Sequence, residues 1–453
     1  MTVSETLARF VTNTGYRDIP EKSVQYTKDL ILSVIGSMLW ASTLPAGKIT
    51  VKLVKEWGGT HEVGVIGCGF KTSLPNATLA AGTFAHASEW EGDSRPESVG
   101  MLSIAPAVLT LGEKYGISGK DILEALIVAH EVQARIGLSA LTATDRGFFS
   151  VPVFGTFGAA IVGAKVLKLT EKQISVALSI AASQAAGTIR QSGSMSHFIE
   201  TGFSARNGLV AAQLAKEGLT AEVDIFEDKK KGIGFGTVAA GKGDYHPEKI
   251  TEGLGRAYRV ELIDTKHYPC HSYQQRALDG VLDIMQKNKL SYQDIESVTV
   301  ETTPLVIHEL DLLDPADGET ARFSIQHGIA GAILEGKVGR DTFTDKTAVD
   351  PRFKEARRKV KLVAQTGGGD AHQPVDVATV TLKNGKKLST SVKSWRGHYT
   401  SPLSRAELIG KFKDATIGML SASQIDQTIE LVLGLEKMVN IKKLTDIINY
   451  PKS

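Results

Sequence analysis

The sequence predicts a mostly helical protein that carries one smaller α+β domain. Three observations indicate this fold class. Apolar residues recur at helical spacing over 5–44 and again over 404–444. Small residues crowd further helical patterns between 105 and 186. After about Ile263 the pattern changes to alternating strands with short helices between them.

The first 44 residues are expected to form helices, with Pro20 at the start of the second one. The nearly uncharged apolar stretches 30–42 and 151–164 fall short of the roughly 20 residues that cross a bilayer. Both are therefore expected to be buried helices. Within a later pattern, Glu131 and Arg135 stand four positions apart on one helical face, which predicts an internal ion pair.

Small residues allow helix axes to approach closely, so packing is the expected role of the runs that they crowd. Those runs are 105–111, 122–134, 155–166 and 174–186.

The region after Ile263 is expected to contain a sheet. Residues 298–302 alternate like a half-buried strand, and 375–382 with 388–392 flank Asn384-Gly385, a strong hairpin signal. Helical runs are expected near 324–334 and 353–362. The sequence therefore predicts a smaller α+β domain inserted between helical parts.

Composition sets broad limits on function. The 453 residues hold 52 Lys plus Arg against 50 Asp plus Glu, so the net charge of +2 gives no reason to expect a nucleic-acid or membrane surface. Cys68 and Cys270 lie far apart and form no metal-binding or disulfide pattern. The first ten residues lack the basic flank and apolar run of a signal peptide. A reducing cytoplasm is the expected location.

Residues 82–97 concentrate ionisable side chains directly after a small-residue helical pattern. A helix that enters this segment buried and leaves it as a loop would line a cleft, and loops on a rigid scaffold often carry catalytic groups. The alternative is a solvated helix end. The ionisable residues are His86, Glu89, Glu91, Asp93, Arg95 and Glu97.

The block from His86 to Asp93 resembles the His-Ala-Leu-Asp-Phe-Asp-Asp-Thr motif of the MmgE/PrpD family. Residues 147–151, 197–205 and 266–271 resemble three further family blocks in the same order. This resemblance implies a two-domain MmgE/PrpD-type fold: an all-helical domain over 1–263, completed by 401–453, and an α+β lid domain over 264–400. It also implies a homodimer, a catalytic cleft between the two domains and no cofactor.

Carried over by position, the blocks give the expected site. Lys266 keeps the family's Lys-x-Tyr-Pro-Cys context, His197 occupies a family Lys position and Glu200 a family His position. Phe149 stands where the family has a His and cannot transfer a proton. The expected catalytic residues are Lys266, His197 and His271. The expected substrate-binding residues are Glu89, Asp93, Arg95, Arg146, Phe149, Glu200 and His267.

Several cations could hold substrate carboxylates, because Arg binds a carboxylate bidentately. For each of them a surface salt bridge is the alternative. The cations are Arg95, Arg146, Arg190, Lys266, His267 and Arg276.

The expected function is proton abstraction next to a carboxylate of a small di- or tricarboxylate. Loss of water or CO₂ requires groups that protonate a leaving group or a carbanion, and His is well suited to this near pH 7. Because His positions have become Phe or Glu here, an epimerase such as iminodisuccinate epimerase is placed first. The alternatives are a lyase like 2-methylcitrate dehydratase or cis-aconitate decarboxylase, and an inactive carboxylate-binding protein. No metal is expected, since the acidic residues of 89–97 show no partner cluster in the sequence.

Overall fold

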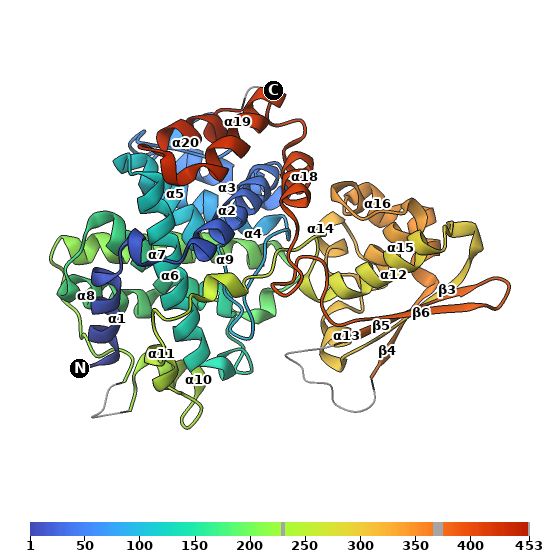
Figure 1. Cartoon of the computed structure of the whole chain (residues 1–453), viewed down its shortest axis with the longest axis horizontal. Coiled ribbons are helices and arrows are strands. Elements are labelled where there is room, and N and C mark those ends of the chain that lie inside the picture. The colour runs from blue at the N-terminus through green and yellow to red at the C-terminus, as the bar shows by residue number, and fades with distance from the viewer. Residues whose placement is uncertain (228–231, 366–374, 452–453) are drawn as a thin grey trace. The chain divides into compact units, whose positions relative to one another are not determined.

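The computed structural model describes residues 1–227, 232–365 and 375–451. The chain divides into two compact units (Figure 1). Unit 1 comprises Met1–Ile263 and Arg405–Ser453, and unit 2 comprises Asp264–Ser404. The expected fold class is confirmed, because helices dominate both units and the larger sheet lies in unit 2.

Unit 1 is built from helices and one short antiparallel pair, in which Val63 lies opposite Thr72. This pair is a small departure from the expected all-helical domain. The elements of unit 1 are α1 (Val3–Asn13), α2 (Glu21–Ala41), α3 (Pro45–Trp57), β1 (Val63–Gly64), β2 (Lys71–Thr72), α4 (Leu74–Ala87), α5 (Ile104–Tyr115), α6 (Gly119–Ser139), α7 (Ser150–Leu167), α8 (Glu171–Gln184), α9 (Met195–Lys216), α10 (Phe235–Ala240), α11 (Glu248–Thr251), α18 (Arg405–Thr416), α19 (Ala422–Leu433) and α20 (Lys442–Asn449).

The core of unit 1 follows from its most apolar helices. α7 is long and apolar enough to cross a membrane by length and composition alone, but 89% of it is buried inside the chain. Residues 30–41 of α2 are buried on all sides. The expectation that both segments are buried helices is therefore confirmed. The predicted ion pair between Glu131 and Arg135 is also present on α6.

The C-terminal segment packs against the beginning of the chain within unit 1. α18 lies against α2, and α19 contacts both α2 and α20. Trp40 of α2 and Ala415 of α18 form a buried cluster with Trp90, from the loop after α4. This packing connects the last 50 or so residues to the segment that carries the candidate site.

Unit 2 contains a four-stranded sheet of order β4-β3-β5-β6. β3 pairs parallel with β4 and antiparallel with β5, and β5 forms an antiparallel hairpin with β6. The elements of unit 2 are α12 (Gln275–Lys287), β3 (Ile295–Thr302), α13 (Pro304–Leu310), α14 (Gly318–Ala321), α15 (Ile325–Glu335), α16 (Asp345–Val349), α17 (Pro351–Arg358), β4 (Val360–Ala364), β5 (Asp376–Leu382) and β6 (Lys387–Val392).

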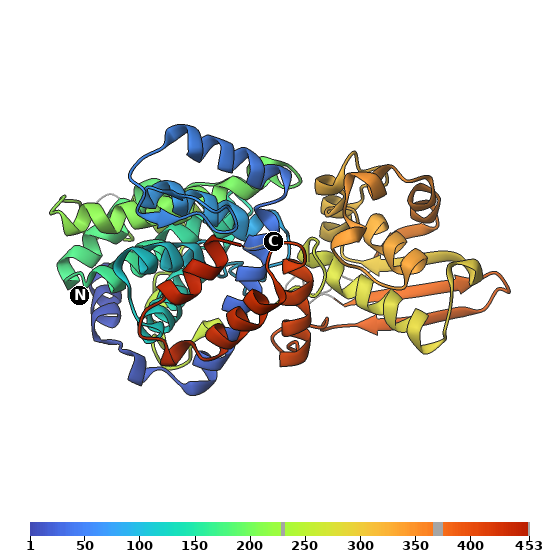
Figure 2. The ribbon, with the colours of Figure 1, turned by 90° about the horizontal axis from the view of Figure 1, so that it is seen from above.

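The strand predictions for unit 2 are confirmed, including the hairpin at Asn384-Gly385, where Gly385 has φ +83°. The helix expected over 353–362 is wrong at its end, because 360–364 form β4, which pairs with β3. Alternate residues of β3 and β5 are buried. The helices of unit 2 lie over one side of its strands (Figure 2), which explains this alternation.

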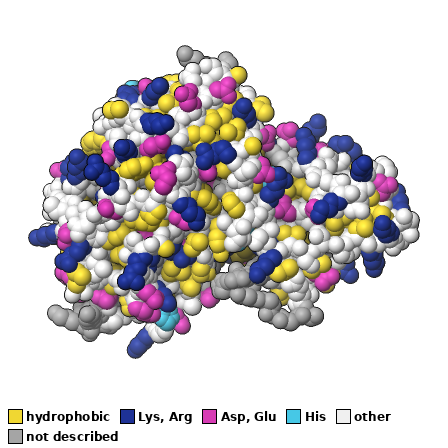
Figure 3. Space-filling model, in the orientation of Figure 1, with side chains coloured by type: hydrophobic (Ala, Val, Ile, Leu, Met, Phe, Trp, Pro, Cys, Tyr) yellow, Lys and Arg dark blue, Asp and Glu magenta, His cyan; other side chains and the backbone are white. Residues whose placement is uncertain are grey.

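The surface charges agree with the near balance of the composition. On the face drawn in Figure 3, Lys and Arg side chains are interspersed with Asp and Glu in both units. The one-sided charge that would attract a polyanion is not seen on this face.

Candidate active site

The candidate site lies where α4 and α9 cross inside unit 1. A methyl group on Gly82 would come within 2.8 Å of the Gly202 Cα, so the two helix backbones meet directly. The Thr201 hydroxyl donates to the Gly82 carbonyl at 2.8 Å, which fixes the crossing. Because residues four apart lie on one helical face, this contact carries His86 of α4 and His197 of α9 to the same place.

Three ionisable side chains meet there. Glu89 Oε1 lies 3.4 Å from His86 Nε2 and 3.9 Å from His197 Nε2. The imidazole rings of His86 and His197 have centroids 4.6 Å apart. All three side chains are at most 5% exposed. We refer to His86, Glu89 and His197 as the His/Glu cluster.

The loop after α4 places Glu89 in a strained conformation. Glu89 has φ +53°, a value that non-glycine residues rarely adopt and that often marks a functional position. The next residue is held firmly: the Trp90 carbonyl accepts a hydrogen bond of 2.5 Å from Lys411 of α18, and the Trp90 ring packs edge-on against Trp40. Glu91 follows, with Oε1 3.8 Å from His86 Nε2.

Aromatic rings enclose the His/Glu cluster. Phe149, directly before α7, stacks on His197 with ring centroids 4.4 Å apart and on His86 at 5.8 Å. Phe198 contacts both imidazoles edge-on. Their apolar surroundings strengthen electrostatic interactions inside the cluster, because few polar groups screen them.

Glu200 lies one turn further along α9. Its Oε1 accepts a hydrogen bond of 2.9 Å from the Thr188 amide. Burial raises the pKa of this carboxyl, while the Thr188 hydrogen bond and the nearby His86 lower it by less. A carboxyl with a raised pKa beside an imidazole is a candidate proton-transfer group.

The His/Glu cluster has the chemistry of an acid–base site. A neutral imidazole accepts a proton near pH 7, and a carboxylate within about 4 Å favours the imidazolium that forms. Of the site residues expected from the sequence, the fold brings Glu89, His197 and Phe149 together and places Glu200 near His86. Their roles in binding and catalysis stay predictions. His86 was not among the expected site residues. A sequence signal for His86 was available: Gly82 lies four positions before it, on the same face of α4.

The other residues expected in unit 1 lie in different surroundings. Asp93 forms an ion pair of 3.5 Å with Arg95. Glu97 is engaged by the Arg259 guanidinium at 2.8 and 2.7 Å, which makes it a structural partner. Arg146 is exposed. The acidic residues of 89–97 therefore do not form one cluster.

The fourth block belongs to unit 2. Lys266 is buried, at 6% exposure, and the His267 ring contacts the Tyr268 ring in a tilted arrangement. The Nδ1 atom of His271 accepts a hydrogen bond from the Tyr273 amide, at 3.3 Å. The expected cleft between the two domains, with Lys266 facing Glu89, stays a prediction. Arg276, one of the expected carboxylate clamps, forms a buried pair with Asp376 at 3.3 Å and is a core residue of unit 2.

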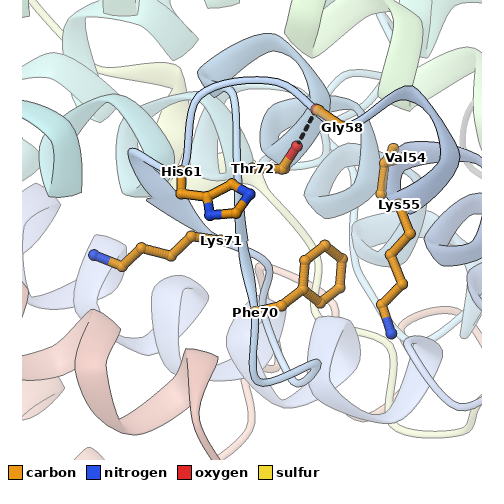
Figure 4. A pocket seen from close by; sticks show the side chains of 7 residues that line it. All are labelled: Val54, Lys55, Gly58, His61, Phe70, Lys71 and Thr72. Carbon is orange, nitrogen blue, oxygen red and sulfur yellow. Dashed lines mark hydrogen bonds between the residues drawn. The ribbon is translucent and has the colours of Figure 1, made fainter.

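A separate hollow on unit 1 lies between α3 and the β1–β2 pair (Figure 4). Its cationic side chains point away from each other, so they do not converge on one anion. We therefore place the candidate active site at the His/Glu cluster. The hollow is lined by Val54, Lys55, Gly58, His61, Phe70, Lys71 and Thr72.

Comparison with known proteins agrees with the motifs. Residues 5–248 match the MmgE/PrpD N-terminal domain, and residues 268–437 match the MmgE/PrpD C-terminal domain. The chain belongs to the MmgE/PrpD family. The resemblance stated from the motifs is thereby confirmed.

Relatives within the MmgE/PrpD family are enzymes. The chain is 25% identical to the cis-aconitate decarboxylase-like protein oryM of Aspergillus oryzae, over 99% of this chain and 97% of the relative. It is 23% identical to cis-aconitate decarboxylase of Homo sapiens, over 99% and 95%. It is also 25% identical to the mitochondrial 2-methylcitrate dehydratase of Yarrowia lipolytica, over 67% and 60%. The names of these relatives are those of decarboxylases and a dehydratase, which supports the lyase alternative over the epimerase.

Proposed function

We propose that this MmgE/PrpD protein is a lyase that releases CO₂ or water from a small di- or tricarboxylate. In decarboxylation the bond to CO₂ breaks and the carbanion left behind takes a proton on one face. In dehydration a proton leaves the carbon next to a carboxylate, and the departing hydroxide takes a proton and becomes water. The observation that carries the proposal is the His/Glu cluster, in which one carboxylate lies within 4 Å of two imidazoles. In this scheme one imidazolium donates the proton, and Glu89 holds the charged ring in place.

The geometry of the cluster favours a lyase over a two-base epimerase. An epimerase that uses two bases needs them on opposite faces of one carbon, each about 3 Å from it, so the two basic atoms are about 6 Å apart. One ring nitrogen of His86 and one of His197 lie within 4.8 Å of each other. This pair therefore suits proton transfer on a single face.

The relatives support the same choice. The relatives reported above that match over nearly their full length are among several that are named as cis-aconitate decarboxylases or as like them. An epimerase was placed first because histidines of the family motifs are missing here. That argument is weaker now, because two imidazoles lie beside Glu89 in unit 1. A homodimer and a cytoplasmic location remain part of the proposal, on the family resemblance and the composition.

One observation favours the epimerase as the second candidate. Phe149 stacks on both imidazoles at the position where the family motif has a His. A lyase loses one proton-transfer group there, whereas an epimerase needs no acid for a leaving group. Because of Phe149, epimerisation is kept as the second reaction class to be tested.

The test is turnover of a polycarboxylate panel in D₂O. cis-Aconitate, 2-methylcitrate and a single enantiomer of a 2-substituted succinate are incubated with the full chain, and CO₂, unsaturated acid and incorporated deuterium are measured. A lyase releases CO₂ or forms an unsaturated acid. Deuterium at the α carbon without loss of CO₂ or water would instead establish the epimerase. Thermal stabilisation by a polycarboxylate with no turnover would indicate a binding protein.

Two matched variants test whether turnover depends on the His/Glu cluster. His197→Gln should lower kcat by about 10² or more, the scale of a lost acid–base group. His61→Gln, at an exposed position beside the separate hollow, should leave kcat unchanged. Equal turnover in both variants would remove the His/Glu cluster from the mechanism.

A further inference from the structure

The His/Glu cluster also has the composition of a metal site. One atom from each of His86, Glu89 and His197 lies within 4.8 Å of the other two. Glu91 Oε1 is a fourth oxygen, 3.8 Å from His86 Nε2. No metal was expected, because no cluster of partner ligands for the acidic residues was evident along the chain. The fold supplies those ligands as two histidines from separate segments.

We propose that His86, Glu89 and His197 bind a divalent transition-metal ion, for which Zn²⁺ is the probe. Imidazole nitrogens and carboxylate oxygens are common ligands of Zn²⁺, at about 2.0–2.2 Å. Two such ligands in tetrahedral geometry are about 3.4 Å apart. The Glu89–His86 separation is 3.4 Å and the Glu89–His197 separation 3.9 Å. The three ligand atoms lie within 4.8 Å of one another, so the side chains have to turn inward to reach this spacing around an ion.

The scaffold around the three ligands is rigid. The backbone contact of Gly82 with Gly202 fixes the two helices that carry the histidines. The Lys411 ammonium holds the Trp90 carbonyl, between Glu89 and Glu91. A metal site needs ligands supported in this way, because the ion tolerates little error in ligand position.

Two histidines and one carboxylate leave coordination positions open, as in metal sites that also bind an exchangeable ligand. Glu91 is the neighbouring carboxylate that could occupy one of them, given its distance of 3.8 Å from His86.

Metal binding has a consequence for catalysis. The nitrogen lone pairs that would coordinate the ion are the ones that transfer protons in the proposed function. Zn²⁺ should therefore inhibit turnover by occupying the cluster. This inhibition rests on the proposed function, whereas metal binding itself does not.

Binding is measured without any turnover. The full chain is treated with a chelator, and ZnCl₂ alone is titrated by calorimetry with elemental analysis of the dialysed protein. We expect one Zn²⁺ per chain. Glu89→Gln and His197→Gln should each weaken the binding by at least about tenfold. His61→Gln and His246→Gln, which change exposed histidines elsewhere, should not.

A measurement on the unchanged chain covers the case that a cluster variant does not fold. X-ray absorption at the zinc edge of the loaded chain should show two histidine nitrogens and a carboxylate oxygen at about 2.0–2.2 Å from the ion. Absence of stoichiometric binding, or a zinc spectrum without histidine nitrogens, overturns the metal site and leaves the proposed function standing. Stoichiometric binding at the cluster without loss of turnover confirms the site and contradicts the acid–base role of these residues.

Discussion

Gly82 and Gly202 meet backbone to backbone where α4 crosses α9, and a methyl group on Gly202 would lie 2.5 Å from the Leu79 carbonyl oxygen. No side chain fits between the two helices at this point. The contact sets the separation of His86 and His197, because each histidine lies about one turn from its glycine. The geometry of the candidate site therefore depends on two residues without side chains.

Gly82→Ala should separate the two helices. Its new methyl group would lie 2.8 Å from both the Gly202 Cα and the Thr201 carbonyl oxygen, which is closer than carbon atoms in proteins approach. Overpacking of this kind costs typically about 1–3 kcal/mol of unfolding free energy. Urea denaturation should show that loss, and turnover should fall as well.

Gly410→Ala is the matched control. Gly410 also lies inside a helix, α18, but nothing lies within 4 Å of the position of its added methyl group. Alanine there should be neutral or stabilise by about 0.4–1 kcal/mol. Similar destabilisation by both substitutions would contradict the argument from the helix crossing.

Lys411 is expected to act as a positioning residue. Its ammonium donates to the Trp90 carbonyl and to the Ser33 hydroxyl, at 2.5 and 2.8 Å. Lys411→Met keeps the length of the side chain and removes both bonds, which should cost about 1–3 kcal/mol. Below the melting temperature, kcat should fall while KM changes little, because the proton-transfer groups lose their alignment.

The control for this effect is Lys413→Met, in the same helix. Lys413 is 52% exposed and lies 3.7 Å from Asp426, in an exposed ion pair. Steady-state kinetics should distinguish the two variants. If Lys411→Met lowers only the melting temperature and leaves kcat intact, its role is structural alone.

Phe149→His tests the reaction class. The new imidazole would lie where a ring now stacks on His197 at 4.4 Å. Release of CO₂ or water should rise, by about tenfold, because a proton-transfer group is added. Phe149→Leu, which adds no such group, should show no rise in the same assay. A gain in the leucine variant would point to a steric effect.

Lys266 stays a predicted proton-transfer group in unit 2. Lys266→Met should lower kcat by about 10² if the ammonium takes part in the reaction. Lys287→Met changes a lysine of the same unit that is 72% exposed and should leave kcat unchanged. Circular dichroism checks that both variants fold. Unchanged turnover in Lys266→Met would exclude Lys266 from the mechanism.

Acid should destabilise the chain through its buried histidines. Burial, together with the Arg357 guanidinium, lowers the pKa of His327 to about 4. Burial and Arg259 lower the pKa of His130 to about 3. In the unfolded chain these histidines bind protons at about pH 6.5, whereas in the folded chain they stay neutral until a lower pH. The free energy of unfolding therefore decreases as the pH is lowered from about 6.5 to 4, by up to about 1.4 kcal/mol per pH unit for each histidine.

Urea denaturation at several pH values measures this slope. His327→Gln removes one titrating group, so the loss of stability between pH 6.5 and 4 should be shallower in the variant. Its matched control is His308→Gln, in α13 of the same unit, which should keep the slope of the parent chain. Identical slopes in all three proteins would contradict the lowered pKa of His327.

Local patterns along the chain were enough to predict most of its helices and strands. Helical spacing indicated α2 and α7, alternation indicated β3, and Asn384-Gly385 indicated the β5–β6 hairpin, because these patterns depend on neighbours along the chain. Residues 360–362 were expected to be helical but lie in β4, since pairing with β3 overrides local helix propensity.

Which ionisable residues meet depends on the fold and could not be predicted from the sequence. His86 and His197 are more than 100 positions apart in the sequence, and their contact depends on the packing of α4 against α9. Local patterns carry no information about such a contact. Glu89 and Glu97 belong to one acidic stretch, but in the fold Glu89 lies beside the histidines and Glu97 pairs with Arg259. The burial of these groups exists only in the folded chain, because water surrounds them in the unfolded one.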